Sequence, residues 1–364
     1  MKMRAEAEEF RPGSQVVQTL SGLGIVLGLS IIAWWVTNKV YGMQLPLGIP
    51  GKALEYPLWA ALVGLVGNVI LKLTNSHSQV RPGIRTELFL KIGLVLMGAG
   101  INLSLLVTAA GGAIIQALIM ITAVFFFTYW LAGKFGLEKK LRAVMATALS
   151  VCGVSAAIAA AGSVLAKKEQ VTYVTALVIV TALPLMVIAP LIAGAINLPE
   201  AVAGAWFGGN IDTTAAVVGA GTIYGETAQQ VATIVKSTQN ALIGLVAFLL
   251  ALAFAAQSED GKTQRPSARI IWDRFPKFVL GFVVASVLFT LGIIDGGKGT
   301  SIEALKNWAF TLAFVCMGLE LSVSEFKKMG WKPVVVFLTA TLFNTLLALG
   351  VSWVIFTYLL PLGG

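Results

Sequence analysis

The chain has 364 residues, of which 57% are hydrophobic and only 12% are charged, and its mean hydropathy is +0.86. So few charges exclude a protein that exposes most of its surface to water, and they predict an integral membrane protein. The net charge of +9 is typical of some nucleic-acid-binding proteins, but the distribution of the cationic residues along the chain argues against that class.

The chain begins with a polar tail, residues 1–16, and the apolar run after it is too long for the hydrophobic region of a signal peptide. We expect this run to stay as a membrane anchor. Further runs follow, each long enough for the roughly 20 residues that a transmembrane helix needs. The predicted spans are 18–40, 56–74, 84–104, 109–132, 140–166, 170–196, 199–221, 226–256, 275–293, 301–321 and 332–358.

The lysine and arginine residues are distributed unequally between the segments that join these spans. If the N-terminus lies inside and every span crosses, 18 of them fall on the inner side and six on the outer side. This is the positive-inside rule. It predicts a multi-pass protein of the inner (plasma) membrane with a cytoplasmic N-terminus and an extracytoplasmic C-terminus. The basic charge therefore reports topology, and no nucleic-acid partner is expected.

A repeat links the third predicted span with the tenth. MGAGINLSLL at Met97–Leu106 resembles MGLELSVSEF at Met317–Phe326, with a constant offset of 220 residues that pairs Gly98 with Gly318. Under the predicted topology the two copies run in opposite directions. Opposite direction defines an inverted repeat, which is common in secondary transporters.

Small and polar residues interrupt the spans 140–166 and 199–221. Irregular backbone is tolerated in a membrane only where it is buried in protein or lines an aqueous cavity. A helix that begins there directs free N–H groups and partial positive charge at the residues before it, and such an end can bind an anion. We therefore predict that substrate binds at Ser150, Cys152, Gly153, Ser155, Gly209, Asn210, Thr213 and Thr214. Close packing of helices is the alternative for the small residues.

The two interrupted segments also resemble each other. SVCGVSAAIAAAG at Ser150–Gly162 matches IDTTAAVVGAG at Ile211–Gly221 with an offset of 59 residues. If all spans cross, these copies run in the same direction. Either the similarity reflects only a shared content of small residues, or one segment is re-entrant, and the sequence leaves both alternatives open.

Asp212 is the most informative single residue in the spans. An aspartate at the centre of a membrane helix costs about 2.5–3.5 kcal/mol on insertion scales, and such residues usually mark ion or proton pathways. Lys236 lies in the next span at a similar depth. We predict that the two residues face each other and couple transport to H⁺ or Na⁺; a purely structural ion pair is the alternative.

Residues 17–364 are predicted to form one transmembrane domain, with residues 257–274 as a cytoplasmic linker, because no polar segment is long enough for a core of its own. Cys152 and Cys316 lie inside predicted spans and indicate neither a disulfide nor a zinc site. The single histidine, His77, is expected to be solvated. Without HExxH, GxSxG or nucleotide-binding motifs, we expect no enzyme, no metal and no cofactor apart from the coupling ion.

At these breaks the chain resembles the YeiH-type family, bacterial membrane proteins described as sulfate exporters and grouped with the bile-acid-symporter and sodium/proton-antiporter superfamily. The family's SICG-type motif matches Ser150–Gly153, its V-V-A-A-G helix end matches Val217–Gly221, and its lysine matches Lys236. The chain departs from the family pattern of a histidine, an acidic residue and a later glutamine, where it has Asp212, Thr213 and Ala216.

The resemblance implies an inner-membrane transporter of a sulfur oxyanion or sulfonate. The predicted fold class is an all-α integral membrane protein of about eleven transmembrane helices, with inverted repeats and discontinuous helices. The predicted function is secondary active export or exchange of a small anion coupled to H⁺ or Na⁺, and the alternative is a cation/proton antiporter that uses Asp212. The expected partners are an anionic solute and the lipid bilayer, with homodimerisation left open.

Overall fold

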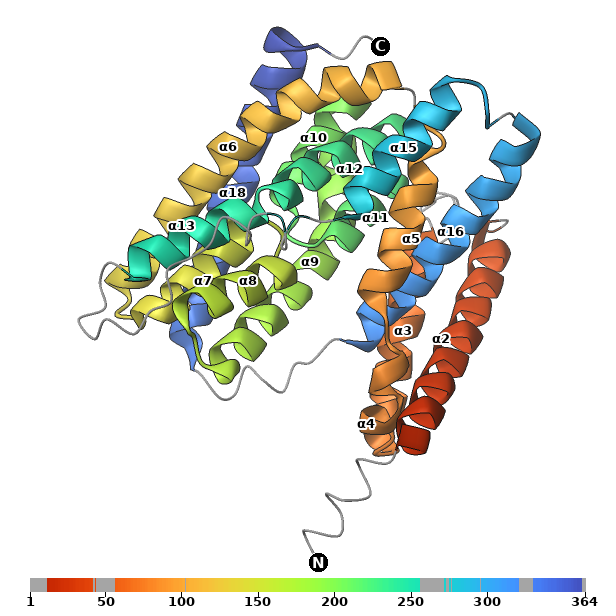
Figure 1. Ribbon diagram of the computed structural model, residues 1–364, viewed down its shortest axis with the longest axis horizontal. Helices are drawn as coiled ribbons and strands as arrows, with labels where there is room; N and C mark the ends of the chain where they lie inside the picture. Colours follow the sequence, from red (N-terminus) through yellow and green to blue (C-terminus); the bar gives the residue numbers. More distant parts are fainter. Residues whose placement is uncertain are drawn as a thin grey trace, which may run out of the picture. The chain divides into compact units, whose positions relative to one another are not determined.

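A computed structural model of the chain describes residues 12–41, 43, 56–101, 103–255, 272, 275, 277–294, 296–320 and 330–361. Within these ranges the chain forms helices joined by turns, and no β-strand occurs there (Figure 1). Two predicted segments fall largely outside the described residues: the tail as far as residue 11, and the linker 257–274 except for Trp272.

Seven helical stretches of the described chain are long and apolar enough to cross a membrane. They are α2 (Pro12–Tyr41), α3 (Tyr56–Leu73), α6 (Leu103–Lys134), α9 (Lys168–Ala195), the consecutive α12 (Glu226–Ala241) and α13 (Ile243–Ala255), α16 (Gly296–Leu319) and α18 (Trp331–Val354). The other helices are shorter. Each of the eleven predicted spans coincides either with one helix or with two consecutive helices. The predicted all-α membrane fold is confirmed.

One compact unit comprises residues 1–100 and 291–321. It contains α2, α3, the short α4 (His77–Val80), a 3₁₀ turn (Arg81–Gly83), α5 (Thr86–Gly98) and α16. Glycines let α3 and α16 approach closely, as small residues do in membranes. A Cβ atom at Gly64 would lie 2.2 Å from the carbonyl oxygen of Val315, and one at Gly318 would lie 2.3 Å from that of Ala61.

The helices that carry the first sequence repeat are antiparallel within this unit. The ring of Phe310 lies against Gly93, and Cys316 interacts with Thr86 at the start of α5. The two matching glycines, Gly98 and Gly318, lie at the C-terminal ends of α5 and α16. The opposite directions that the repeat predicted are therefore present for α5 and α16, while residues 321–326 of the second copy lie outside the described residues.

His77 does not match its expected solvated state. Its side chain is half-buried, and a hydrogen bond of 3.2 Å joins its Nε2 to the carbonyl oxygen of Leu319 at the end of α16. A helix end leaves such carbonyl groups without intrahelical partners, so the imidazole satisfies one of them.

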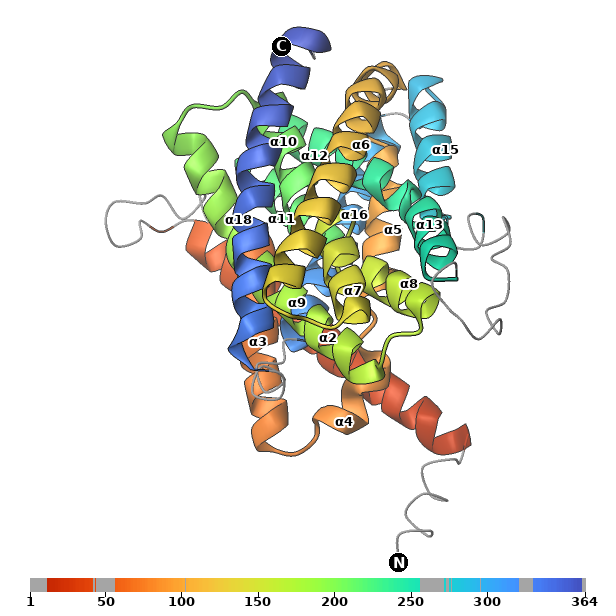
Figure 2. The ribbon, with the colours of Figure 1, turned by 90° about the vertical axis from the view of Figure 1, so that its left-hand side faces the viewer.

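The other compact unit comprises residues 101–290 and 322–364. In Figure 2 its long helices α6 and α18 run side by side, and the rings of Phe127 and Phe343 stack between them with centroids 4.0 Å apart. Four helices of only 11 or 12 residues lie in the same unit. They are α7 (Lys139–Ser150), α8 (Val154–Val164), α10 (Glu200–Asn210) and α11 (Thr214–Tyr224). The unit also contains α9, α12, α13, α15 (Phe278–Thr290) and a π-helical turn (Ile355–Leu359).

The pair α7 and α8 is a re-entrant hairpin, which we call hairpin 1 (residues 139–164). The two helices lie side by side in both views (Figure 1, Figure 2). The Nζ of Lys140, at the start of α7, donates to the carbonyl oxygen of Leu165, just after α8, over 2.9 Å. Because its two ends meet, this segment enters and leaves on one side. An eleven- or twelve-residue helix spans only about 17 Å, roughly half of the hydrocarbon thickness.

The pair α10 and α11 forms hairpin 2 (residues 200–224) in the same way. The hydroxyl of Tyr224, at the end of α11, donates to the carbonyl oxygen of Leu198, just before α10. Glu200, the first residue of α10, accepts a hydrogen bond of 3.0 Å from the backbone N–H of Thr227. Two of the eleven predicted spans are therefore re-entrant, which is one of the alternatives that the second repeat left open.

The two hairpins open at opposite ends of α9 and meet at their tips. Gln170, in the first turn of α9, donates to the carboxylate of Glu138 beside the opening of hairpin 1 over 2.8 Å. Ala193, in the last turn of α9, accepts from Tyr224 of hairpin 2. At the other end of each hairpin, a Cβ atom at Gly153 would lie 3.2 Å from the carbonyl oxygen of Asp212. The tip contact thus lies between the two ends of the long helix α9.

Candidate functional site

Hairpin 1 turns at Val151–Gly153, and glycine is required at the last of these positions for two reasons. Gly153 has φ +68° and ψ −112°, in the region that favours glycine. A Cβ atom there would also lie 2.5 Å from a methyl carbon of Val178 in α9. The turn therefore brings backbone, and not a side chain, against hairpin 2.

Hairpin 2 turns at Ile211–Thr213, where polar side chains fix the ends of both helices. Thr213 is the N-cap of α11, since its hydroxyl oxygen accepts from the backbone N–H of Ala216 over 3.3 Å. At the end of α10, the side-chain oxygen of Asn210 accepts from the hydroxyl of Thr345, and its carbonyl oxygen accepts from the amide of Asn344, both over 2.8 Å. The turn is thus anchored to α18.

Asp212 lies at the tip of hairpin 2 and is only 1% exposed. Neither of its carboxylate oxygens has a hydrogen-bond partner among the described residues, nor does an ion pair within 4.0 Å involve it there. An isolated buried carboxylate costs several kcal/mol or more. The group therefore requires a bound cation, a proton or a ligand with donors.

Lys236 is also buried, with 2% of its surface exposed, but its ammonium has partners. Its Nζ donates to the carbonyl oxygen of Val151 over 2.8 Å and to the side-chain oxygen of Gln239 over 3.1 Å. The charge thus caps the C-terminal end of α7, where the helix dipole is negative. Lys236 and Asp212 are near enough to interact electrostatically, yet they form no direct ion pair.

The tip contact also brings together four helix ends. The N-termini of α8 and α11 present backbone N–H groups and partial positive charge, and the C-termini of α7 and α10 present carbonyl groups and partial negative charge. An anion is stabilised by the first pair of ends, and a cation by the second pair together with Asp212. The region therefore presents groups of both polarities.

The predicted site residues divide into those at the tip contact and those directed elsewhere. Gly153 and Asp212 form the contact, Thr213 follows Asp212 as the N-cap of α11, and Lys236 reaches the contact through the carbonyl group of Val151. Ser155 follows Gly153 in the first turn of α8 and is half-buried. The structure places these residues within one small region of the second unit.

The other predicted residues point into helix contacts. The side chain of Cys152 belongs to an apolar cluster with Ala156 of α8 and Ile243 of α13, although it is also near enough to Lys236 to interact electrostatically. The Ser150 hydroxyl donates back to the carbonyl oxygen of Thr147 over 3.5 Å. Two of the remaining residues contact amides of neighbouring helices: a Cβ atom at Gly209 would lie 2.3 Å from the Gln116 amide nitrogen, and the Thr214 hydroxyl accepts from Asn240 over 3.1 Å.

Sequence reasoning missed the amides that surround the site. Gln239 orients Lys236, Asn240 bonds to Thr214, and Gln116 donates to the carbonyl oxygen of Ala205 over 2.8 Å; all three are buried. The signal was the unbroken polar run Lys236–Asn240 within a predicted span. Five polar residues in succession on a membrane helix indicate polar contacts over more than one face.

Two short hairpins that meet tip to tip beside an unpaired carboxylate, on a bundle of long apolar helices, define a multi-pass integral membrane protein with a polar centre. Residues 21–337 match the family model described as Conserved hypothetical protein 698. The chain therefore belongs to this family, that of the YeiH-type UPF0324 membrane proteins.

Relatives with the name UPF0324 membrane protein occur in several bacteria. One from Rhodopirellula baltica is 35% identical over 97% of this chain and 65% of its own length. One from Nitratidesulfovibrio vulgaris is 36% identical over 83% of this chain and 55% of its own length. Another from the same organism is 30% identical over 86% of this chain and 87% of its own length. The chain thus spans only about 55–65% of two of these relatives. No solved structure matches it.

Proposed function

We propose that this protein is a secondary active transporter that moves a small anion across the membrane, with H⁺ or Na⁺ bound at Asp212 as the coupling ion. The observation that carries the proposal is the buried carboxylate without a partner at the contact of two re-entrant hairpin tips. Ionisable residues at membrane depth usually mark pathways for ions or protons. Transporters commonly place substrate sites where discontinuous helices meet near mid-membrane.

The anion site rests on the N-terminal ends of α8 and α11, with the hydroxyls of Thr213 and Ser155 as neutral donors. Lys236 is held close to this region by Val151 and Gln239 and adds a positive charge to it. Such a site suits a small oxyanion. The family resemblance favours a sulfur oxyanion or a sulfonate, and export or exchange as the direction.

A cation/proton antiporter is the second candidate, and one observation favours it. Because Lys236 bonds to Val151 and Gln239 and not to Asp212, the carboxylate remains available for a cation. The C-terminal carbonyl groups of α7 and α10 add oxygen ligands of the kind that Na⁺ prefers. In this case no anion would be moved.

The re-entrant hairpins also bear on the proposed orientation in the plasma membrane. Two re-entrant segments remove two crossings, so the N-terminus stays cytoplasmic and the C-terminus extracytoplasmic. Lys167 and Lys168, which follow hairpin 1, move to the inner side. The excess of inner cationic residues therefore increases, as the positive-inside rule requires.

The test is a flux assay with the purified full chain in proteoliposomes. Labelled sulfate, sulfite and a sulfonate are offered under imposed pH or Na⁺ gradients. We expect uptake of at least one anion, and we expect Asp212→Asn to abolish its dependence on the gradient. Glu226→Gln, which neutralises an exposed carboxylate at the start of α12, is the matched control and should transport normally.

Two results separate the candidates. Thermal stabilisation by a sulfur anion supports the anion carrier, whereas stabilisation by Na⁺ or Li⁺ alone, together with proton efflux, supports the antiporter. Unchanged gradient-driven flux in Asp212→Asn would contradict both.

A further inference from the structure

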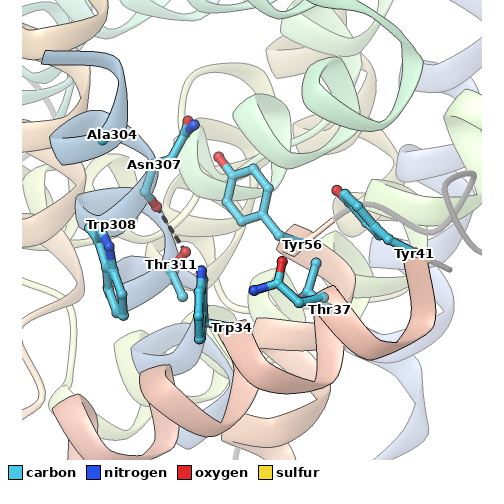
Figure 3. Close-up of a pocket in the computed structure, with 9 residues that line it drawn as sticks. Trp34, Thr37, Tyr41, Tyr56, Ala304, Asn307, Trp308 and Thr311 are labelled. Carbon is cyan, nitrogen blue, oxygen red and sulfur yellow. Dashed lines mark hydrogen bonds between the residues drawn. The ribbon is translucent and has the colours of Figure 1, made fainter. Parts of the chain in front are cut away.

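A cavity of about 270 Å³ lies within the first compact unit, apart from the tip contact of the hairpins. Helices α2 and α16 form its main walls. Each presents residues at spacings of three, four and seven, which is one face of a helix. The lining residues are Trp34, Thr37, Asn38 and Tyr41 from α2, Tyr56 from α3, and Ala304, Asn307, Trp308 and Thr311 from α16. Figure 3 shows the indole rings of Trp34 and Trp308 next to each other, stacked with centroids 6.5 Å apart, with Tyr56 near the centre of the view and Tyr41 at its right.

The position of the cavity along the helices indicates a membrane boundary. Tyr41 is the last residue of α2, and Tyr56 is the first residue of α3. Tryptophan and tyrosine are enriched at both faces of a bilayer, where one end of the ring is apolar and the other meets water. Because Tyr41 and Tyr56 lie at helix ends, we infer that the cavity opens at the level of the phospholipid headgroups.

The lining chemistry defines what this cavity can hold. Its nine residues carry four aromatic rings, two amides and two threonine hydroxyls, and no formal charge. The nearby ions Lys306 and Glu303 pair with each other over 3.7 Å. A phosphate or carboxylate would therefore find no cation in the lining. An acyl chain would leave the amides of Asn38 and Asn307 without polar partners, which is costly in an apolar environment.

An ammonium group suits the same lining. Ring faces of tryptophan and tyrosine attract cations within about 6 Å, and amide and hydroxyl oxygens accept hydrogen bonds from N–H groups. The Thr311 hydroxyl already donates to the carbonyl oxygen of Asn307 over 2.8 Å, so its oxygen can still accept. The volume lies below the roughly 300 Å³ of sites for drug-sized ligands and suits an ethanolamine or choline group.

We propose that this cavity binds an organic ammonium group, presented by the headgroup of a zwitterionic phospholipid whose phosphate stays outside the cavity. The site is independent of the transport site, since it lies in a different compact unit and shares no residue with it. A free quaternary ammonium solute has the same chemistry, and the experiment distinguishes the two sources.

The test uses the full chain in nanodiscs that contain phosphatidylglycerol alone or mixed with phosphatidylethanolamine. Native mass spectrometry counts the lipids that remain bound after extraction. We expect retention of phosphatidylethanolamine over phosphatidylglycerol by about tenfold. Asn307→Leu and Trp308→Leu should each reduce that preference about fivefold. Trp130→Leu, which removes an exposed tryptophan of α6, should leave it unchanged.

Added choline that displaces the retained lipid supports the ammonium chemistry. If choline raises the thermal unfolding temperature of the lipid-free protein more than phosphatidylethanolamine does, the ammonium group comes from a free solute and not from a lipid. Equal retention of both lipids, or unchanged retention in the two cavity variants, would overturn the site itself. A thermal unfolding transition measured for each variant separates loss of binding from loss of folding.

Discussion

The two re-entrant hairpins have helices of similar length but differ in how they are packed. In hairpin 2, every residue of Val202–Asn210 and of Ala215–Gly221 is buried. In hairpin 1, Ala143–Ser150 of α7 is equally buried, but Ile158 within α8 and Leu165 just after it are 54% and 69% exposed. Segments with fewer buried contacts open at lower free energy. The carboxylate of Asp212 is thus carried by the hairpin that is buried along both helices, and α8 of hairpin 1 is the better candidate for movement.

The largest effect is expected at the turn of hairpin 1. Gly153→Ala introduces a side chain at positive φ and against Val178, so strain and overpacking together should cost about 2–5 kcal/mol of unfolding free energy. The measurement is the thermal unfolding midpoint in detergent. Gly136→Ala is the matched control, because Gly136 has φ +73° with no neighbouring atom within 4 Å. Equal destabilisation by the two substitutions would show that Gly153 is not tightly packed against Val178 of α9.

A smaller effect is expected from Gln239, which holds Lys236 by one hydrogen bond. Gln239→Leu frees the ammonium group to pair with Asp212, and we expect gradient-driven transport to fall about tenfold, which corresponds to about 1.4 kcal/mol. Adding Lys236→Met to this variant should cause no further loss beyond that of Lys236→Met alone, since the two residues act together.

Gln229→Leu is the control for this pair. Gln229 lies on the same helix, is buried, and bonds to Thr222. Should Gln229→Leu and Gln239→Leu reduce transport equally, the loss reflects polar burial in α12 and not the position of Lys236.

The smallest effects are expected at the openings of the hairpins. Glu200→Gln weakens a charged cap on the N-terminus of α12 and should cost about 1 kcal/mol, whereas Lys140→Met removes a more exposed hydrogen bond and should cost about 0.5 kcal/mol. Hydrogen exchange, measured separately for each helix, reports both losses of stability. In the unsubstituted chain α8 should exchange faster than α11; the reverse order would mean that hairpin 2 is the mobile element.

The sequence predicted where the helices break but not how the chain continues after each break. Gly153 and Asp212 stood out because glycine and charge are unusual in apolar spans. The reversal of direction depends on contacts such as that of Lys140 with Leu165, 25 residues apart, and hydropathy does not encode them. Each interrupted segment is long enough to cross a bilayer, so length favoured a simple crossing.

The same limit applies to the surroundings of Asp212. Lys236 was predicted as a site residue because it is charged. Gln239, which orients it, is neutral and lies one helical turn away. Likewise, Asn210 was predicted as a substrate ligand from its place in the break, and its side chain bonds to Thr345 of α18. Side-chain direction at an irregular turn depends on tertiary packing, which a single sequence does not reveal.

The contact between Gly153 and Asp212 also has an electrical consequence. Because the tip contact lies between the two ends of α9, Asp212 is placed part of the way along a helix that is long enough to cross the membrane. Moving one elementary charge through a full 100 mV drop requires about 2.3 kcal/mol. In the function proposed above, an ion that moves to Asp212 from one side of the membrane would cross part of this drop, and its occupancy would then respond to the membrane voltage.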